Sequence, residues 1–131
     1  MKKLFFAMMA CVAMIAFSSC EKKDAQIFDL TYDETTGEQA EIMIYQNQYL
    51  PIFMEELAKV AKQPTESGRT FLIDNSTESE AKKIMKPAFE AASAKAQQAA
   101  GEPSVIKGFK VILNYQKGDG KSVEYLSYIF K

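Results

Sequence analysis

TESEAKKIMKPAFEAASAKAQQAAG, residues 77–101, predicts the longest helix of the chain and, with it, a layered fold. Thr77 can cap the start of this helix, and Glu80, three residues on, completes a capping box. Apolar residues follow at helical spacing and form one stripe, made of Ala81, Ile84, Met85, Ala88, Phe89, Ala92, Ala96 and Ala99. Gly101 ends the helix. Pro87 lies off the stripe and is expected to bend the helix without interrupting its apolar face.

A second helix is predicted before it, over residues 50–62. Pro51 suits the first turn of a helix, where its missing N–H is not needed. The apolar residues keep helical spacing and comprise Leu50, Phe53, Met54, Leu57, Val60 and Ala61. Pro64 and Gly68 follow and end the helix.

A strand is predicted before each of the two helices. Residues 26–32 carry closely spaced apolar side chains, and TFLID, residues 70–74, is apolar enough to be a central strand. Residues 33–37 give a strong turn signal, so the apolar run at 41–45 favours a second strand that forms a hairpin with 26–32. One helix over 38–62 is the alternative, because a short apolar run does not distinguish strand from helix.

The last part of the chain predicts a β-hairpin with strands at 109–116 and 122–130. A two-residue turn at Asp119 and Gly120 would set its register. The face turned to the core then pairs Phe109 with Phe130, Val111 with Tyr128 and Leu113 with Leu126. The opposite face pairs Lys110 with Ile129, Ile112 with Ser127 and Asn114 with Tyr125. A three-residue loop would shift this register by one residue.

These elements predict a single α+β domain over residues 26–131. Its sheet is expected to be mainly antiparallel and to consist of two hairpins plus a central strand. The two helices are expected to pack on one face of this sheet. One domain is the natural count at this length.

The composition excludes several kinds of function. The chain has no His, and its only cysteines are Cys11 and Cys20. Ser/His and Cys/His catalysis and zinc sites with the usual ligands therefore lack the residues they need. Residues 20–131 hold 14 basic and 17 acidic side chains, without the clustered basic stripe that nucleic acids require. We expect no enzyme activity, no cofactor and no nucleic-acid partner.

One acidic segment has part of the pattern of a calcium site. Residues 74–80 place oxygen-bearing side chains at alternate positions, as EF-hand loops do. Such a loop needs Gly at its sixth position and Glu at its twelfth, but this sequence has Ser79 and Met85 at these positions. Helix capping by Asn75, Ser76 or Thr77 accounts for the same residues. We therefore expect no metal site.

The first twenty residues have the features of an export signal. Lys2 and Lys3 give a positive start. The fourteen residues that follow, LFFAMMACVAMIAF, are apolar throughout, but a membrane-spanning helix needs roughly 20. The run leads into FSSC, residues 17–20. This segment resembles the cleavage site of bacterial lipoprotein precursors, of the looser kind found in Bacteroidota, although that family usually has Leu where Phe17 stands.

The resemblance implies that residues 1–19 are removed and that Cys20 is acylated. Cysteine usage agrees, because Cys11 leaves with the leader and Cys20 becomes the lone exported thiol. Residues 20–25 would then tether the domain to a membrane, and the expected location is the cell envelope, at the outer membrane. The alternatives are a plain secretory signal cut near Ser18 or Ser19 and an uncleaved anchor.

The sequence leaves the partner of this anchored domain open. The leading expectation is a non-catalytic domain that binds a partner through the sheet face turned away from the helices. In the predicted register this face carries Ile112, Asn114, Tyr125, Ser127 and Ile129, which combine apolar anchors with hydrogen-bonding groups. A carbohydrate-capture module is the alternative, because six tyrosines lie in or beside predicted strands and tyrosine can stack on sugars. A third hypothesis is an inhibitor of an envelope enzyme, which would need a rigid exposed loop.

Overall fold

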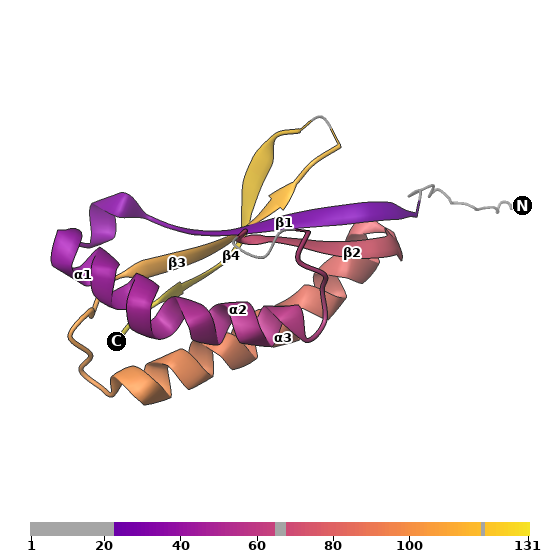
Figure 1. The fold of residues 1–131 in the computed structure, drawn as a ribbon. Helices are drawn as coiled ribbons and strands as arrows, with labels where there is room; N and C mark the ends of the chain where they lie inside the picture. The colour runs from indigo at the N-terminus through magenta and orange to yellow at the C-terminus, as the bar shows by residue number, and fades with distance from the viewer. Residues whose placement is uncertain (1–22, 65–67, 119) are drawn as a thin grey trace, which may run out of the picture.

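The computed structural model describes residues 23–64, 68–118 and 120–131. The predicted leader, Cys20 and the start of the tether lie outside these residues. The elements in chain order are β1 (Asp24–Tyr32), η1 (Glu34–Thr36), α1 (Gln39–Ile44), η2 (Tyr45–Tyr49), α2 (Leu50–Ala58), β2 (Thr70–Ser76), α3 (Glu78–Ala100), β3 (Lys110–Gln116) and β4 (Ser122–Ile129). The four strands form one antiparallel sheet in the order β2-β1-β3-β4. The predicted α+β class is confirmed, and the helices lie on one side of the sheet (Figure 1).

The core lies between the sheet and the helix layer. Burial alternates along the two central strands, so that Phe28 and Leu30 of β1 and Val111 and Leu113 of β3 are buried while their neighbours are half-buried. This period of two is what a sheet covered on one face produces. From the helices, Phe53 of α2 and Phe89 of α3 meet with their ring centres 5.6 Å apart.

The long helix α3 begins and ends where the sequence predicts. The Glu80 N–H donates to the Thr77 hydroxyl, and the Glu80 carboxylate accepts from the Thr77 N–H, which completes the predicted capping box. Gly101 follows the helix with φ +79°, and the helix is continuous through Pro87. Two members of the predicted stripe are not buried: Ala99 is exposed, and Ile84 is 40% exposed.

The predicted first hairpin is wrong, because the apolar run at 41–45 is helical. A capping box between Glu38 and Glu41 starts the helix, and the chain then stays helical from α1 through the π-helical segment η2 to the end of α2. Buried residues follow four apart, at Tyr45, Tyr49, Phe53 and Leu57, which is the helical spacing. The long helix left open as the alternative is therefore the better description, although α2 ends at Ala58, before Lys62.

The prediction that TFLID is a central strand is also wrong, because β2 lies at the edge of the sheet and β1 and β3 are central. Its apolar character has two sources. Phe71 and Ile73 are buried in the core, and Leu72 pairs with Ile27 on the opposite face. An isolated antiparallel bridge between Lys62 and Leu72 then covers the outer edge of β2.

The C-terminal hairpin has the predicted register over half of its length. Lys110 pairs with Ile129, Val111 with Tyr128, Ile112 with Ser127 and Leu113 with Leu126, and the Phe130 N–H bonds the Phe109 carbonyl. A β-bulge then follows, so that Asn114 pairs with Glu124 and not with Tyr125 as predicted. Asp119 of the predicted turn lies outside the described residues.

Candidate functional site

The sheet face opposite the helices is open and carries one aliphatic side chain from each strand. Leu72 of β2 and Ile27 of β1 are a cross-strand pair, and Ile112 of β3 lies towards the other end of the sheet, near Ile129 of β4. The first three are half-buried, and Ile129 is 54% exposed. We call this surface the open face.

Polar contacts between strands separate these aliphatic side chains. The Asp29 carboxylate accepts hydrogen bonds from the Thr70 hydroxyl at 2.9 Å and from the Ser122 hydroxyl at 3.5 Å. The Lys110 ammonium lies 3.4 Å from the Glu124 carboxylate. The open face therefore alternates apolar groups with hydrogen-bonding groups, as the usual surface of a protein contact does.

Four of the five predicted surface residues lie on the open face, namely Ile112, Asn114, Ser127 and Ile129. The prediction for Tyr125 is wrong. The bulge adds one residue at this point of β4, and the Tyr125 side chain turns to the helix side. Its hydroxyl donates to the Lys82 carbonyl at 3.0 Å, and its ring lies 6.2 Å from that of Phe28. Burial in this position raises the pKa of the Tyr125 hydroxyl.

The tyrosines do not form an exposed row. Tyr45, Tyr49 and Tyr115 are buried, and Tyr32, Tyr125 and Tyr128 are half-buried. Each has an aromatic ring beside it, with centres 4.9 to 6.3 Å apart. The Tyr45 hydroxyl is buried without a hydrogen-bond partner among the described residues, and burial raises its pKa.

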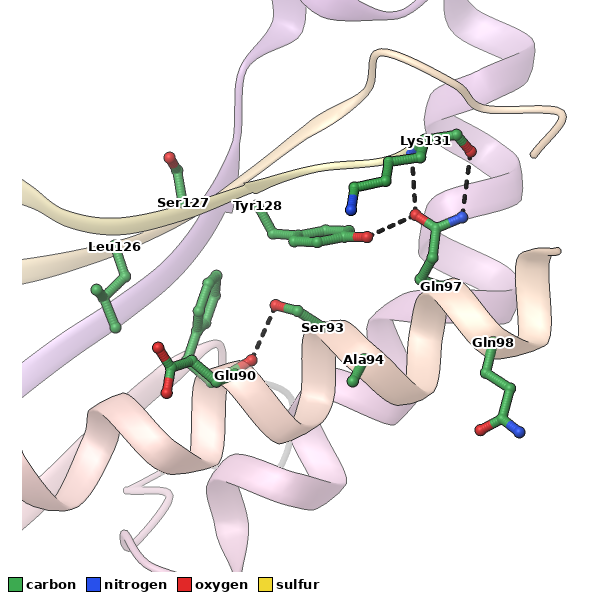
Figure 2. A pocket seen from close by; sticks show the side chains of 10 residues that line it. Glu90, Ser93, Ala94, Gln97, Gln98, Leu126, Ser127, Tyr128 and Lys131 are labelled. Carbon is green, nitrogen blue, oxygen red and sulfur yellow. Dashed lines mark hydrogen bonds between the residues drawn. The ribbon is translucent and has the colours of Figure 1, made fainter. Parts of the chain in front are cut away.

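A groove of about 620 Å³ runs between α3 and the edge strand β4 (Figure 2). Phe89 of α3 and Leu126 and Tyr128 of β4 give it an apolar lining. Glu90 lies towards one end of the groove and Lys131 towards the other (Figure 2). The sequence did not indicate this groove, because it depends on how α3 lies against β4, and neither element shows that by itself.

One side chain ties the two walls of the groove together. The Gln97 side-chain oxygen accepts from the Tyr128 hydroxyl at 2.6 Å and from the Lys131 N–H at 2.9 Å. Its nitrogen donates to the Gly101 carbonyl at 2.7 Å. It also donates to the Lys131 carbonyl at 3.1 Å (Figure 2). Gln97 therefore uses all the hydrogen-bonding capacity of its amide, and it fixes the end of β4 to α3.

The acidic segment 74–80, which spans the end of β2 and the start of α3, serves the fold. Asp74 forms an ion pair with Lys62, and Glu80 is used in the cap of α3, which lowers the pKa of its carboxyl through the hydrogen bond from the Thr77 N–H. Within residues 23–64, 68–118 and 120–131, no cluster of three or more Cys, His, Asp or Glu side chains is arranged to hold a metal ion. The helices of these same segments also lack the combination of length and apolarity that a membrane crossing needs.

Comparison with known proteins gives no further information on the site: no family model, no curated protein and no solved structure matches the chain.

Proposed function

We propose that this protein is a lipid-anchored protein of the bacterial cell envelope, at the outer membrane, whose domain binds a protein partner without catalysis. The observation that carries the binding role is the open face. In the described part of the chain the helices lie on one side of the sheet, and the other side presents an aliphatic side chain from each of the four strands among hydrogen-bonding groups.

The anchoring role rests on the leader and on Cys20, the lone thiol that remains after removal of residues 1–19. Strand β1 begins at Asp24, two residues before the start that the sequence predicted. Only three residues, 21–23, then lie between Cys20 and the sheet, and the four Cα–Cα steps from Cys20 to Asp24 span at most about 14 Å. An acylated Cys20 would hold the domain close to the membrane surface, where its partner is most readily another envelope protein.

The carbohydrate-capture alternative has less support. It requires tyrosine rings at the surface, and the tyrosines pack against other aromatic rings in and around the core. The aliphatic side chains of the open face fit a protein surface better than a sugar, because sugars stack on aromatic rings. The inhibitor hypothesis needs a rigid loop, and the loops that include residues 65–67 and 119 lie partly outside the described residues.

The test is co-purification from the native envelope after cross-linking. Wild type is compared with the double variant Ile112→Ser, Ile129→Ser, which removes two aliphatic side chains from the open face. We expect the double variant to fold and to lose a protein that wild type captures. Met43→Ser is the control, because Met43 is 51% exposed on α1, on the helix side of the molecule. If the double variant stays folded and retains every partner of wild type, the open face is not the binding surface.

A further inference from the structure

The groove between α3 and β4 has the size and the lining of a small-ligand site. Its volume of about 620 Å³ lies within the range of pockets that hold small molecules, about 300–1,000 Å³. Phe89 of α3 and the half-buried Leu126 and Tyr128 of β4 make its floor apolar. In such a site the floor holds the apolar part of a ligand, and a few polar groups at the margin decide which ligand fits.

The charged side chains that line the groove are Glu90 and Lys131. They lie towards opposite ends of it (Figure 2). Both are exposed, and neither forms an ion pair with a described residue. By contrast, Lys95 of the same helix pairs with Glu56 at 2.7 Å. The groove therefore presents one carboxylate and one ammonium group whose charges the described part of the domain does not neutralise, with apolar surface between them.

The helix sets the separation of these two charges. Glu90 and Gln97 are seven residues apart on α3, which corresponds to about 10 Å along the helix axis. The Gln97 amide bonds the Lys131 N–H at 2.9 Å and the Lys131 carbonyl at 3.1 Å, so Lys131 lies level with Gln97. A ligand that complements both ends must carry a cation and an anion about 10 Å apart on an apolar body.

We infer that the groove binds a short apolar peptide with free ends, its carboxylate at Lys131 and its ammonium group at Glu90. Three residues in extended conformation measure about 10 Å, which matches the separation of the two charges. The apolar side chains of the peptide lie against the floor of the groove. A fatty acid is a poorer match, because its single charge leaves Glu90 without a partner. The inference does not depend on the anchor or on the partner of the open face.

The two ends and the floor contribute differently to binding. Both ion pairs lie at the exposed margin of the groove, where such a pair changes an affinity by about two- to fivefold. The larger contribution comes from the apolar surface that the peptide covers. The free ends therefore act mainly as a selection for peptide length and direction.

The test is isothermal titration calorimetry of the full chain, in a non-ionic detergent, with the tripeptide Val-Ala-Leu. A ligand of this size should bind with a Kd between about 20 μM and 1 mM. Its C-terminal amide lacks the anion, and its N-acetylated form lacks the cation. We expect each of these two peptides to bind about two- to fivefold more weakly than the peptide with free ends.

Variants assign each end of the peptide to its residue. Lys131→Gln should remove the difference between the free and the amidated peptide and keep the effect of acetylation. Glu90→Gln should do the opposite. The bonds between Gln97 and Lys131 use the Lys131 backbone, so the first substitution leaves them in place. Lys83→Gln is the control, because Lys83 is exposed on α3 and does not line the groove; it should keep both differences.

Ala94→Phe blocks the site without disturbing the core, because Ala94 is exposed and lines the groove. It should abolish saturable binding while its circular dichroism stays that of wild type. Absence of saturable binding of the free tripeptide to wild type overturns the inference. So does binding that Ala94→Phe leaves unchanged, or equal affinity for all three peptides. Affinity that depends on the carboxylate alone would also overturn it and would favour a fatty acid as the occupant.

Discussion

Replacing Gln97 with methionine tests whether this single side chain holds the end of β4 to α3. Methionine has nearly the same length and helix propensity as glutamine, so the change removes four hydrogen bonds and little else. The bond from the Tyr128 hydroxyl is half-buried and contributes about 1 kcal/mol. The other three are exposed and compete with water, so together they contribute about 1 kcal/mol more. We expect Gln97→Met to lower the free energy of unfolding by about 2 kcal/mol.

The assay is urea unfolding, followed by circular dichroism, together with thermal melting. The expected loss corresponds to a fall in Tm of about 8 °C or more for a domain of this size. Gln98→Met is the matched control, since Gln98 is exposed on the same helix and its side chain makes no hydrogen bond to a described residue. A double-mutant cycle with Tyr128→Phe isolates one of the four bonds, and we expect the two changes to be less than additive. Equal, small effects of Gln97→Met and Gln98→Met would refute the reasoning.

Three further predictions concern stability. Tyr45→Phe should raise the free energy of unfolding by about 1–3 kcal/mol, because it removes a buried hydroxyl without a partner among the described residues; a destabilised variant in urea unfolding would show a hidden partner. Phe89→Ala should lower the free energy of unfolding by about 3–5 kcal/mol, because the Phe89 side chain is 2% exposed and packs against Phe53. Pro87→Ala, at an exposed helix position, should leave the free energy of unfolding unchanged or raise it. The reverse ranking of the two variants would contradict the burial of this face of α3. Hydrogen bonds from Lys59 and then Lys95 lower the pKa of Glu56 below its ordinary 4.5. The ionised Glu56 carboxylate therefore stabilises the fold fully above pH 4.5, and this stabilisation is lost as the pH falls through the lowered pKa. The difference in Tm between wild type and Glu56→Gln should shrink as the pH is lowered across this range. A difference in Tm that does not change with pH would exclude the ion pairs of Glu56 as its cause.

The sequence predicted those elements whose boundaries are marked by local chemistry. The start of α3 follows from the reciprocal hydrogen bonds of Thr77 and Glu80, and its end follows from Gly101. The core half of the C-terminal hairpin follows from alternation, because Val111 and Leu113 must share a face with Tyr128 and Leu126. These features depend on residues close together in the chain or on a period that only one structure satisfies.

The sequence-based prediction was wrong where the same residues fit both the period of a strand and the period of a helix. The run IMIY at 42–45 is compatible with a strand, and only the burial of Tyr49 and Phe53 beyond it shows the helical spacing. The place of β2 at the sheet edge depends on the distant bridge to Lys62, which no local pattern indicates.

The candidate site was partly predictable for the same reasons. Alternation along β3 put Ile112 and Asn114 on the open face. The bulge that turns Tyr125 inward adds one residue to β4 without a glycine or proline to mark it. The groove between α3 and β4 arises from packing between distant elements, so it could be found only in the structure.

Acylation of Cys20 tests the central claim most directly, because the proposed location and the role of the domain both depend on the anchor. The full chain is expressed in a bacterial host that processes lipoproteins, labelled with a fatty-acid analogue and compared with Cys20→Ala and Cys11→Ala. We predict that wild type and Cys11→Ala carry the label in the membrane fraction and that Cys20→Ala carries none. Equal labelling of wild type and Cys20→Ala, or no labelling of either, would contradict the account.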